Sequence, residues 1–157
     1  MRAGYHFTML PDTPTRWADH AVARLEHSGH RWGSARRAVV EVLAGQSCCL
    51  TAQQIADRLR AQGADVGLAS VYRALELLSS LRLVHRLDVG DGTARYERAD
   101  PTGEHHHHLV CDRCGAVAAF EDDGLEHAIE ALSGRLDFEM GGHDIVLRGT
   151  CRGCDAV

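Results

Sequence analysis

The sequence predicts an α+β fold made of two unlike units, and three observations support this prediction. Apolar residues recur at helical spacing up to Leu81, and strand-like runs then flank a Gly90-Asp91-Gly92 turn. Beyond residue 104 the chain carries two Cys-x-x-Cys pairs, the arrangement of a four-cysteine zinc site. We expect a flexible arm at residues 1–16, a first unit at 17–98, a hinge at 99–104 and a second unit at 105–157.

Four helices are expected in the first unit, at residues 17–28, 34–44, 51–59 and 68–81. The third begins with Thr51 and has Gln54 three residues later, which is a capping-box signature. Strand-like runs at 83–87 and 94–97 then form a hairpin. Short helices followed by a hairpin are typical of a winged helix-turn-helix, with residues 68–82 as its recognition helix.

The second unit is expected to combine an extended segment at 105–110, a helix at 124–136 and a strand at 144–147. About 50 residues bury too little apolar surface to be stable alone. A bound zinc ion and association into a dimer are therefore both expected to stabilise this unit.

The net charge of −5 is unevenly distributed. Residues 17–98 carry 11 arginines and 9 acidic residues, whereas residues 99–157 carry 4 arginines and 12 acidic residues, and the chain has no lysine. This asymmetry indicates two units with different partners. No apolar stretch approaches 20 residues and the N-terminus lacks a signal-peptide pattern, so we expect a cytoplasmic protein without a membrane span.

The four cysteines Cys111, Cys114, Cys151 and Cys154 are expected to bind one structural zinc ion. In a reducing cytosol, paired cysteines favour metal binding over a disulfide. The alternatives are a redox-active dithiol centre and unpaired core cysteines.

Four consecutive histidines, His105 to His108, precede the first cysteine pair. Side chains alternate along a strand, so His105 and His107 face one way and His106 and His108 the other. Each pair can chelate a metal ion but needs further ligands, and a solvated polar run is the alternative. The available ligands are His85, Glu97, Asp100, Glu126, His143 and Cys49.

The arginines of the first unit indicate that it binds DNA. Arg31, Arg36 and Arg37 lie near the start of the second helix, and Tyr72 and Arg73 lie early in the recognition helix. Residues early in a recognition helix reach base edges, and neighbouring arginines contact phosphates. Ordinary solvated helix faces are the alternative.

Six segments resemble the ferric uptake regulator family: GHRWGSARRAVVEVL, TAQQIADRL, LASVYRALELLSSLRLVHR, ARYE, EHHHHLVCDRCGAV and GHDIVLRGTCRGC. They span residues 29–154. The resemblance implies a winged-helix DNA-binding domain, a hinge, a small α/β dimerisation domain and metal-dependent repression. It implies three groups of metal ligands: the four cysteines for structural zinc, His106 and His108 for the sensing site, and His105, His107, Glu126 and His143 for a site within the dimerisation domain. It also implies that Tyr72 and Arg73 face DNA.

The remaining sensing ligands combine two patterns of that family. Glu97 stands where iron-type members have a glutamate ligand, and Cys49 where those members usually have a histidine. His85 stands where zinc-type members have a ligand, but the thiol that many of them carry after the wing has no counterpart at 98–100. Zinc and ferrous iron are therefore both candidates for the sensed metal, and His85 and Cys49 favour zinc slightly.

The sequence thus predicts a homodimeric, metal-responsive repressor that binds a palindromic operator in double-stranded DNA and is not an enzyme. An iron-sensing regulator and a peroxide sensor of the same fold are the alternatives. A zinc hydrolase or deaminase is also conceivable from the histidines, but the H-x-E and P-C-x-x-C signature of deaminases is missing.

Overall fold

The computed structural model describes residues 14–30, 33–99 and 106–155. Its N-terminal unit, residues 14–99, comprises α1 (Pro14–His27), α2 (Ser34–Ala44), β1 (Leu50–Thr51), α3 (Ala52–Ala61), α4 (Leu68–Ser80), β2 (Val84–Asp88) and β3 (Ala94–Arg98). Its C-terminal unit, residues 106–155, comprises β4 (His107–Cys111), β5 (Val117–Phe120), α5 (Asp123–Leu136), β6 (Val146–Gly149) and α6 (Arg152–Asp155). These elements confirm the α+β class. Expectations for His105, Arg31, Asp100 and most of the arm and hinge fall outside the described residues.

The helices of the N-terminal unit enclose the main hydrophobic core. Trp17 of α1, Ile55 of α3 and Leu75 of α4 are among its fully buried side chains. The indole Nε1 of Trp17 donates a hydrogen bond to the Leu83 carbonyl oxygen (3.2 Å), which ties α1 to the start of the β2–β3 hairpin. The core therefore fixes the orientation of α4 relative to the β2–β3 hairpin.

Most local predictions of helix boundaries are confirmed. Thr51 and Gln54 form the expected capping box, with reciprocal hydrogen bonds of 3.1 and 2.9 Å. Helix α1 begins at Pro14 instead of residue 17, because proline is well suited to the first turn of a helix. Residues 14–16 thus belong to α1 and not to an arm. The sequence did not predict β1, β5 or α6, which contain only two to four residues each.

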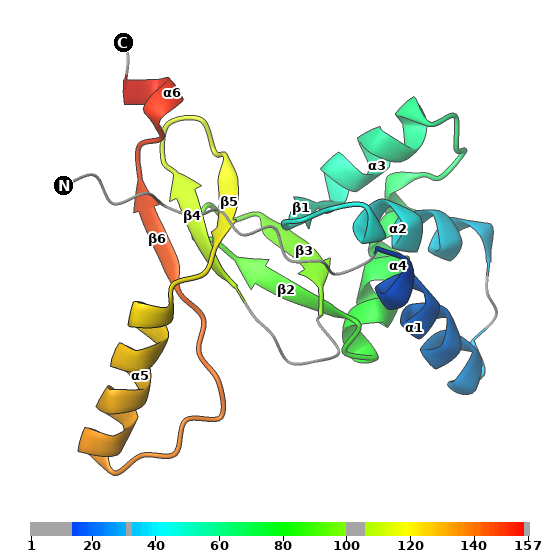
Figure 1. Ribbon diagram of the computed structural model, residues 1–157. Coiled ribbons are helices and arrows are strands. Elements are labelled where there is room, and N and C mark those ends of the chain that lie inside the picture. Colours follow the sequence, from blue (N-terminus) through cyan, green and yellow to red (C-terminus); the bar gives the residue numbers. More distant parts are fainter. Residues whose placement is uncertain (1–13, 31–32, 100–105, 156–157) are drawn as a thin grey trace.

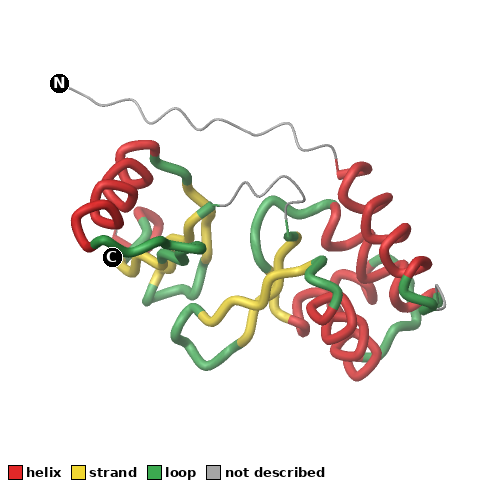
Figure 2. The backbone as a smooth tube through the Cα atoms, turned by 90° about the horizontal axis from the view of Figure 1, so that it is seen from below, coloured by secondary structure: helices red, strands yellow, loops and turns green. Residues whose placement is uncertain are grey.

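Each unit contains one three-stranded sheet. The first has the order β1-β3-β2 and is antiparallel, and the second has the order β5-β4-β6, with β4 and β6 parallel. The β2–β3 hairpin lies between the helices of the N-terminal unit and the second sheet (Figures 1 and 2). The two sheets approach each other where Glu97 of β3 contacts His108 of β4.

Helix α5 lies at the far side of the second sheet and has no fully buried residue in the single chain. Large apolar side chains on and near it are exposed: Leu109, Leu132, Leu136, Phe138 and Leu147. Leu109 and Leu147 are neighbours in the β4–β6 register, so part of this apolar surface is continuous across the sheet. Such a surface indicates a protein–protein interface.

One arginine connects the two units. Arg148 of β6 donates from its guanidinium to the carbonyl oxygen of Val89, the residue after the end of β2. Its Nε atom also donates to the Asp112 carboxylate at 2.9 Å.

Among the described residues, no helix is long and apolar enough to cross a membrane.

Replacing Leu75 with alanine tests the core that positions α4. Leu75 is completely buried, so Leu75→Ala should lower the free energy of unfolding by about 2–5 kcal/mol through lost burial and a residual cavity. Urea denaturation measures the change. The adjacent exposed substitution Glu76→Ala is the control and should change stability by less than about 0.5 kcal/mol. Equal effects of the two substitutions would contradict the core assignment.

Candidate metal centres

The four cysteines of the C-terminal unit converge on one point. Strands β4 and β6 are parallel neighbours, with Cys111 opposite Gly149, so the segments that follow them emerge at the same edge of the sheet. Cys111 is the last residue of β4 and Cys114 follows it, whereas Cys151 and Cys154 both follow β6. All four Sγ atoms lie within 4.8 Å of one another.

The spacing of these sulfur atoms fits a tetrahedral zinc ion. Sulfur atoms about 2.3 Å from a shared zinc ion are about 3.8 Å apart. The Sγ atoms of Cys114 and Cys151 are separated by 3.8 Å. Backbone N–H groups of Cys151 and Cys114 lower the pKa of Cys111 to about 6, which favours the thiolate that binds metal.

A second cluster joins the two units through Glu97, His106 and His108. The Nε2 atoms of His106 and His108 lie 2.9 and 3.0 Å from Oε2 of Glu97, which belongs to β3. The two histidines alternate with His107 along the chain, as expected for a strand, and their ring centroids are 4.9 Å apart. Glu97 and His108 are buried and His106 is partly buried, so water solvates this cluster poorly.

The charges of this cluster are strongly coupled. Burial disfavours ionised Glu97, but hydrogen bonds from His106 and His108 outweigh it and lower the pKa of Glu97 to about 2. Burial also disfavours protonated His108, yet its hydrogen bonds to Cys48 and Glu97 raise its pKa to about 9. A carboxylate held between two imidazoles offers oxygen and nitrogen donors to a divalent cation, which would replace the protons.

A third cluster lies within the C-terminal unit and contains His107, Glu126 and His143. His107 of β4 is 2.6 Å from Oε1 of Glu126 on α5, and His143 is 3.2 Å from Oε2 of the same residue. His107 is almost fully buried and packs against the ring of Phe120. The side chains predicted for the dimerisation-domain site therefore meet, apart from His105, which lies outside the described residues.

His85 is not part of any of these clusters among the described residues. It lies on β2 opposite Glu97, and its side chain is exposed. The cross-strand register places it next to the cluster, but its ring nitrogens are not grouped with those of His106 and His108. Its role as a ligand stays a prediction.

Two adjacent cysteines adjoin the second cluster: Cys49, which the sequence already offered as a ligand, and Cys48, which it did not. Cys48 is partly exposed, and its thiol lies near Cys49 and His108. The hydrogen bond from Cys49, followed by His108, lowers the pKa of Cys48 to about 5 despite partial burial. The same pairing raises the pKa of Cys49. The signal in the sequence was the pair of adjacent cysteines, one of which replaces a histidine usual in the resembling family.

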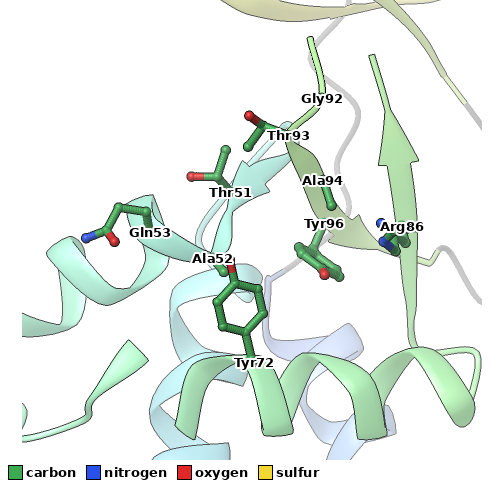
Figure 3. A pocket seen from close by; sticks show the side chains of 9 residues that line it. All are labelled: Thr51, Ala52, Gln53, Tyr72, Arg86, Gly92, Thr93, Ala94 and Tyr96. Atoms are coloured by element: carbon green, nitrogen blue, oxygen red, sulfur yellow. The ribbon is translucent and has the colours of Figure 1, made fainter. Parts of the chain in front are cut away.

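A separate groove lies between α4, the start of α3 and the β2–β3 hairpin. Figure 3 shows Tyr72 rising from α4 toward Ala52, with Arg86 and Tyr96 on the hairpin side. Tyr72 is 46% exposed, and Arg73 is exposed and donates to the Ser70 hydroxyl at 3.0 Å. Arg36 is partly buried on α2. The exposed face of α4, with its tyrosine and arginine side chains beside a hairpin, is suited to a DNA groove.

The sequence model of the ferric uptake regulator family matches residues 27–148. The chain belongs to this family. The ferric uptake regulation protein of Bacillus subtilis is 34% identical over 139 residues, which cover 87% of this chain and 93% of that protein. Family membership agrees with the resemblance found in the sequence.

Solved structures of the family agree with the observed fold. The Vibrio cholerae ferric uptake regulator matches with a TM-score of 0.74 and 29% identity, covering 82% of this chain and 98% of that chain. The Helicobacter pylori regulator matches with a TM-score of 0.82 over 96% of this chain and 99% of that chain, at 23% identity. These matches confirm the predicted winged-helix and α/β architecture.

Proposed function

We propose that this ferric uptake regulator family member is a cytoplasmic, homodimeric, metal-dependent transcriptional repressor and not an enzyme. The observation that carries the proposal is the Glu97–His106–His108 cluster. Glu97 lies on the wing strand β3, and both histidines lie beyond the segment 100–105. Ligands from both units at one site allow metal binding to set the angle between them.

The proposed domains follow from this arrangement: a DNA-binding domain at 14–98, which includes all of α1, a hinge at 99–104 and a dimerisation domain at 105–157. The four cysteines hold a structural zinc ion, His107, Glu126 and His143 form a further metal site, and Glu97, His106 and His108 sense metal. Bound metal supplies a coordinate link between wing and dimerisation strand. The side chains of the cluster thereby fix the orientation of α4 in each protomer, and the competent geometry becomes the dominant population.

A dimer is part of the proposal because a palindromic operator presents two half-sites to two recognition helices. The exposed apolar residues around α5 and the Leu109–Leu147 edge support association of two C-terminal units. The strongly acidic second half keeps this unit away from DNA, whereas arginines of the first half face it.

Operator binding titrated with metal tests the function. A binding site is first selected from random double-stranded DNA in the presence of zinc, and gel shifts are then measured at buffered concentrations of zinc, ferrous iron, manganese and nickel. We expect metal to increase operator affinity by about 5–150-fold, with zinc acting at the lowest free concentration. DNA binding that is equally tight in metal-free and metal-loaded protein would refute the proposal.

Ferrous iron is the second candidate for the sensed metal, because the Glu97 carboxylate places an oxygen ligand atom beside the ring nitrogens of His106 and His108. With iron bound, oxidation of a metal-ligating histidine would make the protein a peroxide sensor. Mass spectrometry of the peptide containing His106 and His108, after exposure to peroxide with ferrous iron, distinguishes this function. Oxygen added to a histidine together with loss of operator binding would favour the peroxide sensor.

Replacing Arg73 with alanine tests the DNA-binding face. Arg73→Ala should weaken operator binding by about 1–3 kcal/mol and reduce base preference if its guanidinium reads a guanine edge. Arg36→Ala is the matched comparison: loss of a phosphate contact should weaken binding to all sequences alike and flatten the salt dependence. Gel shifts with specific and scrambled DNA measure both effects. Unchanged affinity in both variants would show that α4 is not the recognition helix.

A further inference from the structure

The loop between α2 and β1 brings two adjacent thiols to the boundary between the units. The Sγ atom of Cys48 lies 3.9 Å from that of Cys49 and 4.0 Å from the carbonyl oxygen of Val117 on β5. Both cysteines are free thiols. The Cys48 thiol of the N-terminal unit therefore contacts β5 of the C-terminal unit, with the Cys49 thiol next to it.

Strand pairing explains this position. Leu50 of β1 is the register partner of Tyr96 on β3, so the preceding residue, Cys49, comes beside Glu97. Glu97 is the carboxylate that contacts His108 at 3.0 Å. The pairing of β1 with β3 thus places the thiols of Cys48 and Cys49 beside the cluster of Glu97, His106 and His108.

The three donors of Cys48, Cys49 and His108 have the spacing of a metal site. Their ligand atoms all lie within 4.8 Å of one another. The Cys48–Cys49 sulfur separation of 3.9 Å is close to the 3.8 Å between Cys114 and Cys151 in the four-cysteine cluster. Both agree with the edge of about 3.8 Å expected for sulfur atoms bound to one tetrahedral zinc ion.

We propose that Cys48 and Cys49 are metal ligands that, together with His108, form a sulfur–nitrogen shell selective for zinc. Glu97 or His106, which flank His108, supplies the fourth donor. The inference deepens the proposed function and rests on it, because it assigns the sensed metal and further ligands to the same site.

His108 is shared by two alternative donor sets. With Glu97 and His106 it offers oxygen and nitrogen donors, and with Cys48 and Cys49 it offers sulfur and nitrogen. Thiolates favour zinc, whereas carboxylate donors suit manganese. A zinc ion is therefore bound by Cys48 and Cys49 of the loop, by His108 of β4 and by one flanking residue. A harder cation is bound only by Glu97, His106 and His108.

Cobalt(II) spectroscopy tests the thiolate ligation. Cobalt is added to protein whose four-cysteine cluster retains zinc, and the difference spectrum is recorded. We expect the intense near-ultraviolet absorption of sulfur-to-cobalt charge transfer. The double variant Cys48→Ser/Cys49→Ser should lose this absorption and bind zinc at least about tenfold more weakly, since changes outside the ligand set already cost about 10–100-fold. Ser47→Ala, in the same loop, is the control and should retain both properties.

Thiol alkylation with peptide mapping provides a second measurement on the unaltered chain, which remains decisive if the double variant fails to fold. Added zinc should protect Cys48 and Cys49 from iodoacetamide, and manganese at the same free concentration should not. Cobalt binding without charge-transfer absorption, or equal alkylation rates with and without zinc, overturns the inference. Metal-dependent operator binding would in that case still support the proposed function. Conversely, if the thiolates bind metal but metal has no effect on DNA binding, the proposed metal site would stand and the proposed function as a metal-dependent repressor would be refuted.

Discussion

Cys111→Ser is expected to remove the zinc ion of the four-cysteine cluster and to unfold the C-terminal unit. Cys111 ends β4, the central strand of the second sheet, and its thiol accepts a hydrogen bond from the Cys151 backbone N–H at 3.3 Å. Structural zinc sites contribute about 10–16 kcal/mol in small domains at neutral pH. Among the described residues of the C-terminal unit, the buried apolar side chains are those of Val110 and Cys111 on β4. Its stability therefore depends on the metal.

Elemental analysis and size-exclusion chromatography measure this effect. We expect Cys111→Ser and Cys154→Ser to lose about one zinc ion per chain and to become monomeric or misfolded, because each removes one of four thiolates. Cys48→Ser is the matched cysteine control, and it should keep the structural zinc and the dimer. Unchanged zinc content in both cluster variants would disprove the assignment.

The sequence predicted the parts of the fold that are determined by local patterns. The capping box of Thr51 and Gln54 marks the start of α3 because both hydrogen bonds join residues three apart. The alternation of His106, His107 and His108 follows from strand geometry alone, and the structure places them in two different clusters. The cysteine pairs were recognisable because each spans only one turn.

The sequence could not predict contacts that depend on pairing between distant strands. Strand β1 has only two residues and no periodicity, yet its register with Tyr96 brings Cys49 beside Glu97. The exposed position of His85 likewise depends on the register and twist of β2 against β3. Tertiary pairing, which no local pattern encodes, decides which residues adjoin His108.

His108→Ala is expected to abolish the metal dependence of operator binding while leaving the structural zinc and the dimer intact. His108 is 3% exposed and belongs to both donor sets, so alanine removes one ligand from each. The variant should keep only the weak binding of the metal-free protein, a loss of about 1–3 kcal/mol in coupling free energy. His106→Ala should act in the same direction, because His106 also contacts Glu97. Gel shifts over a range of buffered zinc concentrations measure both.

His127→Ala is the matched histidine control, since His127 is an exposed residue of α5 outside the three clusters formed by the described histidines. It should respond to metal like the original protein, and a loss of response in this variant would show a nonspecific effect of histidine removal.

His85→Ala and Glu97→Ala then identify the metal. A site that requires His85 suits zinc, whereas dependence on Glu97 without dependence on Cys48 and Cys49 suits ferrous iron or manganese. If His85→Ala leaves zinc-dependent binding unchanged and Glu97→Ala removes iron-dependent binding, the assignment of zinc through His85 fails. Zinc would then remain the sensed metal only through the thiols of Cys48 and Cys49, and their replacement decides between zinc and iron.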